Sequence, residues 1–350
     1  MDGDEMEPQR TITIVPKPNR KLLNEKEHLD YYEYRKSLLT WLLKFGKTPK
    51  KAKGYSPYTV FATGYRAAAF DRWLWSERGY HIPPTQEDAT AYMREVALSD
   101  ESDTSKGKKL EMLRRYSKWL TGQHGQKEWE FSWEFKSGGG NNQPRDFLSM
   151  DERREIRQAA LKFDGNPAYG VEDKDALSIV DGSWKYTSLV WTSLDAAFRP
   201  VEVGRAKVGW VDVDNGVLRI PIEDSSKNEG NWTVSITDRT ATALKRWLEE
   251  RARHPRYKDT DALWLTRHGN KYGANELRRM LHKLCDSAGI DYEHRQMSWY
   301  TIRHSVGTYM TKERDLAATK AQLRHRSPKT TMKYDQVPVE DRRDALDRMG

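Results

Sequence analysis

The sequence is poor in cysteine and has no long apolar run. Its 350 residues include one cysteine, Cys285, which excludes a disulfide framework and a zinc site built on paired cysteines. We expect this lone thiol to be a buried structural residue of a helix. No stretch approaches the roughly 18 apolar residues of a membrane span, and the opening residues MDGDEMEPQR are too charged for a signal peptide. These absences predict a soluble, cytoplasmic protein without a membrane partner.

The sequence also lacks internal repeats and the motifs of nucleotide-binding and metal-dependent enzymes. Residues 137–144 read SGGGNNQP, but no Gly-Lys-Ser or Gly-Lys-Thr follows, so the glycines predict a flexible joint rather than a phosphate-binding loop. No constellation of metal ligands is visible, so neither a metal nor another cofactor is expected. The joint, which we place at residues 137–146, divides the chain into two domains.

Basic residues, by contrast, are plentiful. The formal net charge is +8, which suits an acidic partner such as nucleic acid, although an ordinary soluble surface explains this excess equally well. A stronger signal is a cluster of basic residues along one predicted helix, on the side opposite its apolar residues. We predict that the residues of this cluster bind DNA: Lys106, Lys108, Lys109, Arg114, Arg115 and Lys118.

The first domain is predicted to be all-helical and to span residues 21–136. It follows a tail at residues 1–20 that contains prolines, lacks sustained periodicity and is expected to be mobile. A long amphipathic helix is expected first, and Ser56 and Thr85 are good caps for the next two helices. The basic cluster lies on the helix after these.

The second domain, residues 147–350, is predicted to mix helices with a few strands. Ser149 and Glu152 form a capping box that starts its first helix. Two β-prone runs within residues 210–220 flank Asp-Asn-Gly, a strong hairpin signal, and a third run follows at residues 232–236. The predicted fold is therefore mainly α with a small β-sheet.

The stretch from residue 298 to residue 335 holds the residues that best suit chemistry. It opens with a helical pattern whose apolar face is formed by Ile302, Val306, Tyr309 and Met310. Tyr300, Arg303 and Gly307 share a different face because residues three and four apart lie above one another on a helix. The pattern therefore predicts an arginine beside a phenol, away from the core.

Two proline-marked turns bring further candidates. Arg199 precedes Pro200, which disfavours the helical conformation for it, so we expect Arg199 in a turn between two helices. Ser327 and Pro328 are a good cap and first residue of a short helix, which places Tyr334 about two turns into that helix. Arginine, imidazole and phenol groups near one chain end would suit chemistry on a phosphodiester.

Five short segments resemble, in order and spacing, the motifs of the tyrosine recombinases (the phage-integrase family). The resemblance covers roughly residues 55–337, and its last tyrosine, Tyr334, follows a histidine, His325, by nine residues. It implies a helical core-binding (SAM-like) domain followed by a mixed α+β catalytic domain. The segments are AFRPVE at 197–202, SSKNEG at 225–230, YTIRH at 300–304, LRHRS at 323–327 and TTMKY at 330–334.

The resemblance implies that Tyr334 attacks a scissile phosphate while Arg199 and Arg303 bind its non-bridging oxygens. The chemistry of these side chains agrees. A free phenol has a pKa near 10, so it needs nearby cations to become a competent nucleophile. An arginine fork binds phosphate and keeps its proton, so two forks can stabilise a pentavalent transition state. A covalent phosphotyrosine conserves the bond energy, so no ATP is required.

Further roles follow from the resemblance alone. Lys227 would protonate the leaving 5′ oxygen, His325 would hydrogen-bond the phosphate, and Glu202 would support an arginine, with His304 counted as a second supporting residue. Other interpretations stay open for three of the candidates: a helix-end salt bridge for Arg199, an exposed turn lysine for Lys227, and a buried core tyrosine for Tyr334.

Two positions depart from the family pattern. Tyr300 stands where the family usually has histidine; its phenol can donate a hydrogen bond to phosphate but is a poor base near pH 7. Arg324 stands where the family usually has glycine, which would suit a left-handed turn. We expect either that this loop is rebuilt or that Arg324 reaches DNA.

These observations predict a site-specific DNA recombinase of the integrase kind, encoded by a prokaryotic cell, virus or mobile element. Its expected partners are duplex DNA at a recombination site, three further copies in a synaptic tetramer and an accessory DNA-bending protein. Two alternatives remain open. One is a nicking and resealing enzyme resembling a type IB topoisomerase, and the other is a DNA-binding relative whose active site has decayed.

Overall fold

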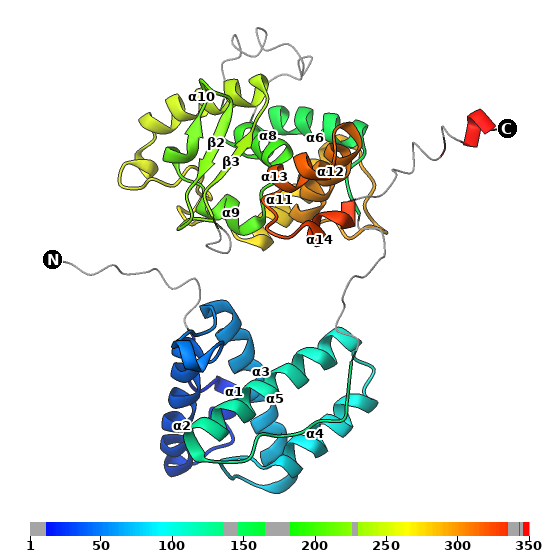
Figure 1. The fold of residues 1–350 in the computed structure, drawn as a ribbon. Helices are drawn as coiled ribbons and strands as arrows, with labels where there is room; N and C mark the ends of the chain where they lie inside the picture. Colours follow the sequence, from blue (N-terminus) through cyan, green and yellow to red (C-terminus); the bar gives the residue numbers. More distant parts are fainter. Residues whose placement is uncertain are drawn as a thin grey trace. The chain divides into compact units, whose positions relative to one another are not determined.

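The chain folds into two compact units, Met1–Asn141 and Asn142–Gly350 (Figure 1). The computed structural model describes residues 12–135, 146–164, 183–225, 230–334, 343 and 346–349. The joint predicted at residues 137–146 lies outside this part of the chain, except for its last residue. Most of the chain is helical and a small sheet lies in the second unit, so the predicted fold class is confirmed.

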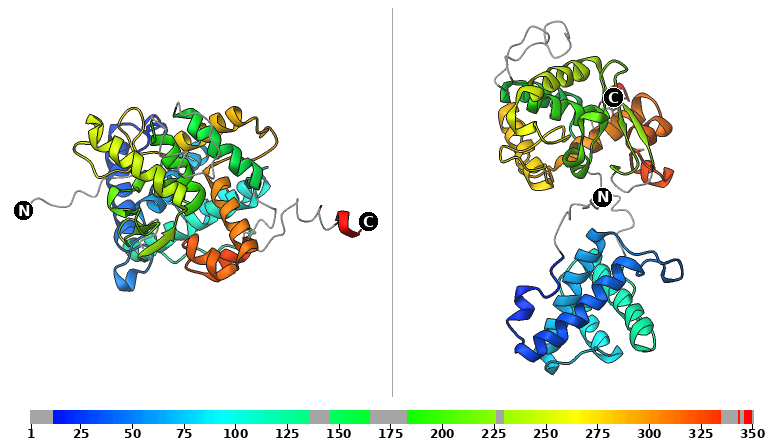
Figure 2. Two further views of the ribbon diagram at one scale, coloured as in Figure 1. Left: turned by 90° about the horizontal axis from the view of Figure 1, so that it is seen from above. Right: turned by 90° about the vertical axis from the view of Figure 1, so that its left-hand side faces the viewer.

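The first unit is a bundle of helices joined by capped turns (Figure 2). Ser56 accepts a hydrogen bond from the amide of Thr59, and Thr85 forms a capping box with Asp88, so both predicted helix starts are confirmed. The core lies between α2, α3, α4 and α5 and is rich in aromatic side chains such as Trp119. The helices of this unit are α1 (Lys17–Arg20), α2 (Glu25–Lys44), α3 (Pro57–Arg78), α4 (Gln86–Leu98) and α5 (Asp103–His124), with a 3₁₀ turn η1 (Pro49–Lys51).

The prediction of a mobile tail at residues 1–20 was wrong for the part that the structure describes. Residues 17–20 form α1, and the fully buried Asn19 donates a hydrogen bond of 2.8 Å to the carbonyl of Ala68 in α3. The carbonyl of Ile14 accepts from the buried side chain of Arg35. This segment is too short to show a periodic pattern, so only its tertiary contacts identify it as part of the core.

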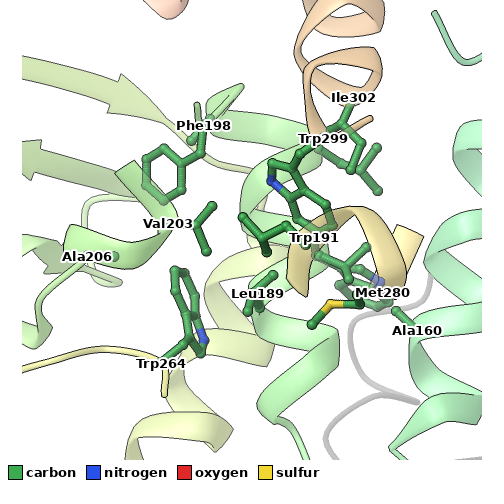
Figure 3. Packing of buried hydrophobic residues seen from close by; sticks show 14 of the residues in the cluster. Ala160, Leu189, Trp191, Phe198, Val203, Ala206, Trp264, Met280, Trp299 and Ile302 are labelled. Atoms are coloured by element: carbon green, nitrogen blue, oxygen red, sulfur yellow. The ribbon is translucent and has the colours of Figure 1, made fainter. Parts of the chain in front are cut away.

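The second unit surrounds a core of tryptophans and aliphatic residues (Figure 3). Trp191, Trp264 and Trp299 come from three separate segments and are each at most 1% exposed. The lone thiol of Cys285 is also fully buried, as the sequence predicts. Burying such large apolar side chains is the main source of stability for the unit.

The helices of the second unit begin with a capping box at Ser149, as predicted. None of the helices among the described residues is long and apolar enough to cross a membrane. The helices are α6 (Met150–Phe163), α8 (Lys185–Ala196), α9 (Pro200–Arg205), α10 (Asp238–Arg253), α11 (Ala274–Ala288), α12 (Trp299–Glu313), α13 (Leu316–Gln322) and α14 (Pro328–Thr331). The 3₁₀ turns are η2 (Val208–Trp210), η3 (Pro255–Tyr257) and η4 (Met332–Tyr334).

Three short strands, β1 (Val211–Asp212), β2 (Val217–Ile220) and β3 (Trp232–Ser235), form an antiparallel sheet in the order β1-β2-β3. The predicted hairpin is present, and Gly216 in its turn has a φ of 62°, which glycine adopts without strain. At the edge of β3, the side-chain amide of Gln322 donates to the carbonyl of Ser235 at 2.7 Å and accepts from its amide at 3.2 Å. One side chain therefore ties the end of α13 to the sheet.

Candidate active site

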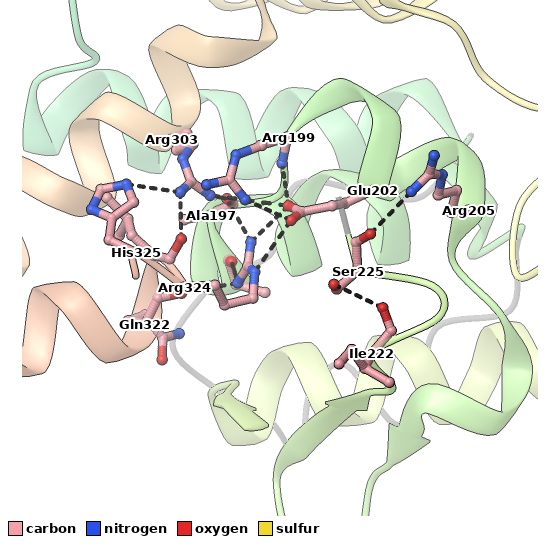
Figure 4. Close-up of polar contacts among 12 residues, drawn as sticks. Ala197, Arg199, Glu202, Arg205, Ile222, Ser225, Arg303, Gln322, Arg324 and His325 are labelled. Carbon is pink, nitrogen blue, oxygen red and sulfur yellow. Dashed lines mark hydrogen bonds and ion pairs between the residues drawn. The ribbon is translucent and has the colours of Figure 1, made fainter. Parts of the chain in front are cut away.

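The first part of the site is the turn between α8 and α9. Arg199 is the N-cap of α9, with extended backbone angles of −71° and 153°, because Pro200 excludes the helical conformation at the residue before it. The carboxylate of Glu202 accepts the backbone amide of Arg199 at 2.7 Å and its guanidinium at 2.8 Å (Figure 4). The proline and the carboxylate together fix where this arginine lies.

Glu202 is the anionic centre of the site. Its side chain is 2% exposed, and the guanidinium of Arg324 reaches it at 2.8 Å while that of Arg303 lies 4.0 Å away. Burial alone would raise the pKa of Glu202, but the charges of Arg324, Arg199 and Arg303 outweigh it and lower the pKa to about 2. The carboxylate therefore stays ionised at every physiological pH.

Arg303 is held by backbone carbonyls from two segments. Its guanidinium donates to the carbonyl of Ala197 at 2.6 Å and to the carbonyl of Leu323, and it lies 3.1 Å from Nε2 of His325. Burial and the charges of its neighbouring arginines lower the pKa of Arg303 to about 9, so it remains a cation at neutral pH. An arginine fork that keeps its charge has the chemistry to bind a phosphate.

His325 links this cation to Tyr334. Its Nδ1 shares a hydrogen bond of 3.0 Å with the hydroxyl of Thr331, and its ring stacks on that of Tyr334 with centroids 5.8 Å apart and an angle of 14°. The sequence predicts one short helix that contains Tyr334. The structure has α14 followed by the 3₁₀ turn η4, which ends at Tyr334.

Tyr334 is buried against α12. Its hydroxyl shares a hydrogen bond of 3.0 Å with Nδ1 of His304, and its ring lies directly on Gly307, where a Cβ atom would be 2.4 Å from its Cδ1 atom. Only a residue without a side chain lets the ring come this close to the helix. The phenol is thus placed between the two imidazoles of His304 and His325.

The expectation that Arg324 reaches DNA was wrong. The backbone there does keep the left-handed conformation that suits glycine, with a φ of 56°, but the side chain turns inward and is 1% exposed. Its guanidinium donates to the carbonyls of Ala196, Ala197 and Gln322 as well as to Glu202. Arg324 is therefore an internal partner of the buried carboxylate of the site.

The helix face also differs from the prediction at Tyr300 and Arg303. α12 is buried on nearly every side, so Arg303 points into the protein while Tyr300 is 42% exposed and stacks on His304 with ring centroids 6.2 Å apart. The two side chains are not neighbours on an outward face.

Lys227 lies outside the described residues. The segment before it is anchored at the carbonyl of Ser225, which accepts from Arg205 at 3.1 Å.

The basic cluster on α5 is divided rather than one-sided. Lys106 donates to the carbonyl of Ala97 at 2.9 Å and Lys109 pairs with Glu101, so both lie against the end of α4. Arg115 donates to Thr63 at 2.7 Å and lies over the ring of Tyr55. The members of the predicted cluster that remain exposed are Lys108, Arg114 and Lys118.

Several supporting groups could not be recognised from the sequence. The carbonyl of Ala197, a residue in the left-handed conformation with a φ of 51°, accepts from both Arg303 and Arg324. A backbone carbonyl cannot be recognised in a sequence motif, because every residue has one. Thr331, the partner of His325, does belong to a motif segment, TTMKY. Within the part of the chain that the structure describes, no three His, Cys, Asp or Glu side chains gather as a metal site would require.

Several known proteins are similar to this chain. The sequence model of the phage integrase family matches residues 177–340, the range that supplies every residue of the site. The match lies within the second unit, so this part of the chain resembles the phage integrase family. The tyrosine recombinase XerD of Bifidobacterium longum is 23% identical over 294 residues, which cover 82% of this chain and 89% of that protein. The tyrosine recombinase XerC of Corynebacterium efficiens is 31% identical over 131 residues, 37% of this chain and 39% of that protein.

Solved structures of a recombinase and of a transposon integrase share the fold. The XerH recombinase bound to its difH substrate aligns with a TM-score of 0.60 at 16% identity, over 94% of this chain and 90% of that chain. The Tn1549 transposon integrase in complex with a circular intermediate DNA aligns with a TM-score of 0.56 at 13% identity, over 88% of this chain and 99% of that chain. The shared fold therefore extends over both units of this chain.

Proposed function

We propose that this protein is a member of the phage integrase family, a site-specific DNA recombinase that cuts and rejoins duplex DNA through a covalent 3′-phosphotyrosine at Tyr334. The observation that carries the proposal is the charge balance beside this tyrosine. Three arginines, Arg199, Arg303 and Arg324, surround the single carboxylate of Glu202, which leaves two positive charges in excess. A pentavalent phosphorane carries two negative charges, so the site matches the transition state better than the singly charged substrate.

Each group has a role that its position supports. Arg199 and Arg303 would bind the non-bridging oxygens of the scissile phosphate, and His325, next to Arg303, would hydrogen-bond one of them. Glu202 orients the arginines without touching DNA. Lys227, whose role rests on the sequence motif alone because it lies outside the described residues, would protonate the leaving 5′ oxygen as general acid. The exposed hydroxyl of Tyr300 would donate to the phosphate in place of the usual imidazole.

Several features of the relatives support finer proposals. The related structures are of recombinases and integrases bound to DNA, so duplex DNA is the proposed substrate, held by both units. Exchange between two duplexes needs four cleavages, which four protomers in one synapse would supply, and an accessory DNA-bending protein would help to assemble it. A virus or mobile element is the proposed source of the gene. The nicking and resealing alternative is less favoured because the relatives are named recombinases. The decayed binding module is less favoured because the candidate groups Arg199, Arg303, His325 and Tyr334 lie in one cluster.

The test starts from the parent protein and a library of random-sequence duplexes, each carrying a nick so that cleavage is irreversible. Covalent adducts isolated from this library by denaturing electrophoresis identify a suicide substrate. Tyr334→Phe should bind this duplex with unchanged affinity and form no adduct, because it lacks the attacking oxygen. The matched control Tyr292→Phe removes a hydroxyl that bonds only with Asp286 among the described residues, and it should form adduct normally.

An adduct of normal yield from Tyr334→Phe would refute the assignment of the nucleophile. Recombination between two copies of the trapped site on one plasmid then separates a recombinase from an enzyme that only nicks and reseals. Loss of supercoils without exchange of the sites would favour the topoisomerase-like alternative.

A further inference from the structure

The hydroxyl of Tyr334 already has an imidazole partner. His304 lies one residue after Arg303, so its side chain leaves α12 about 100° further around the helix. Arg303 points toward the carbonyl of Ala197, whereas His304 points toward η4 and comes within 3.0 Å of the phenol oxygen. This distance is within the 2.6–3.2 Å that a general base needs to take a proton directly.

Gly307 sets this contact. His304 and Gly307 are three residues apart and therefore share one face of α12. The ring of Tyr334 rests on Gly307, where a Cβ atom would overlap it at 2.4 Å, and its hydroxyl then lies one turn earlier along the helix, at His304. The helix holds both the ring and the oxygen of the nucleophile, so the hydrogen bond has little freedom to change.

The other candidates for a base are already engaged or unsuitable. Nε2 of His325 lies against the guanidinium of Arg303 and its Nδ1 shares a hydrogen bond with Thr331, so both of its ring nitrogens already have partners. Tyr300 offers a phenol, and phenols are poor bases at neutral pH because they hold their own proton there. An imidazole, by contrast, is ordinarily neutral at physiological pH and can accept a proton.

We infer that His304 is a catalytic residue, the general base that accepts the proton of Tyr334 during cleavage; this inference rests on the proposed function. The Tyr334 oxygen forms a bond to phosphorus and the bond from phosphorus to the 5′ oxygen breaks. The phenolic proton passes to Nδ1 of His304, and the leaving 5′ oxygen takes a proton from the ammonium group of Lys227. In rejoining, the His304 imidazolium returns its proton to the departing phenolate.

This role compensates for the residue at position 300. The tyrosine that replaces the usual histidine stacks on His304, with ring centroids 6.2 Å apart, and so covers one face of the imidazole. The three rings of Tyr300, His304 and Tyr334 follow one another from the exposed side of α12 to the nucleophile. The imidazole of His304 lies one helical turn after position 300, where the family usually has histidine. It acts on the nucleophile instead of on the phosphate.

Single-turnover cleavage of the trapped suicide duplex tests the inference with His304→Gln and His304→Asn. Both variants should bind DNA with unchanged affinity and cleave about 10²- to 10⁴-fold more slowly, the usual contribution of a general base. Placing a fluorinated tyrosine, whose phenol is more acidic, at position 334 should restore about tenfold in rate for each unit by which the phenol pKa falls. The same replacement should change the parent protein much less.

A second substrate separates the base from the acid. A duplex with sulfur in place of the bridging 5′ oxygen has a leaving group that needs no proton, so it should rescue Lys227→Ala but neither His304 variant. The adduct formed by the parent protein, and its absence in Tyr334→Phe, establish the reaction independently of His304. Parental cleavage rates in the His304 variants would overturn the inference. So would slow variants that the fluorinated tyrosine does not rescue, or the failure of both variants to fold, since each makes the imidazole a structural residue only.

Discussion

The substitution Arg324→Gly introduces the residue that the phage integrase family usually has at this position. The structure predicts that it lowers the free energy of unfolding. The substitution has one favourable effect. Arg324 has a φ of 56°, a left-handed conformation that costs a residue with a side chain roughly 1–2 kcal/mol. Glycine adopts this conformation freely, although its larger freedom in the unfolded chain cancels part of the gain. The net relief of strain is about 1 kcal/mol.

The unfavourable effect is larger. Removing one partner of a buried ion pair typically costs about 3–5 kcal/mol because it leaves an uncompensated charge, and Arg324 contacts Glu202 at 2.8 Å with both side chains at most 2% exposed. Arg199 and Arg303 remain near the carboxylate, so the lower end of this range applies. The expected loss in the free energy of unfolding is therefore about 2 kcal/mol. Arg324→Met keeps the strain and loses the pair, so it should be about 1 kcal/mol worse than Arg324→Gly.

The pH dependence gives a second measure of the same interaction. The pKa of Glu202 falls from 4.5 to about 2 in the folded protein, which corresponds to about 3 kcal/mol of stability at neutral pH. A depressed pKa gives stability that is fully present above the unfolded pKa and is lost as the pH falls toward the folded one. Without Arg324 the folded pKa should rise, so the parent and the variant should converge in stability between about pH 4.5 and pH 2.

Urea denaturation followed by native-state hydrogen exchange at the α8–α9 turn measures these changes without assuming that the two units unfold together. The control is Arg326→Gly, which removes an exposed arginine from the same loop and should change stability little. If Arg324→Gly is as stable as the parent at pH 7, the ion pair contributes no more than the strain, and the reasoning from burial is refuted.

Two further predictions concern the nucleophile and the DNA-binding unit. Gly307→Ala should displace the ring of Tyr334 and slow adduct formation by about 10²-fold at unchanged DNA affinity, since a shift near 1 Å has this effect. Gly209→Ala, where an added Cβ meets nothing within 4 Å, should be silent, and equal rates in the two variants would contradict the packing argument. Neutral replacements on α5 should lower the log–log salt slope of DNA binding by about 0.9 for each phosphate that the protein no longer neutralises. The control is Lys109→Gln, which should leave the slope unchanged because Lys109 is already paired with Glu101. An unchanged slope in the α5 variants would mean that this face does not contact DNA. The replaced residues are Lys108, Arg114 and Lys118.

Local signals in the sequence predicted much of this fold. The capping residues Ser56, Thr85 and Ser149 act within one helical turn, and Pro200 restricts the residue beside it, so no tertiary information is needed to place them. The hairpin around Gly216 is local in the same sense. The helix starts, the turn that holds the first arginine and the first hairpin of the sheet could therefore be predicted.

The direction in which side chains point was harder to predict. Arg324 turns inward because Glu202, a residue 122 positions earlier in the chain, offers it a buried partner. Lys106 turns toward the end of α4, whose position depends on how the helices pack. Periodicity failed for Arg303 because α12 is buried on nearly all sides and so has no single polar face. Each error concerns a side chain whose direction depends on how separate elements pack.

The side chain of Gln322 has a consequence for how this protein behaves at high concentration. β3 is an edge strand, and an edge with free amide and carbonyl groups invites a strand from another molecule. At Ser235 both backbone groups are already bonded to one glutamine side chain, which acts as a substitute for the next strand. An incoming chain would have to displace α13, and with it the turn that carries His325, before it could pair there. The residue that fastens the catalytic loop to the sheet therefore also protects that edge from aggregation.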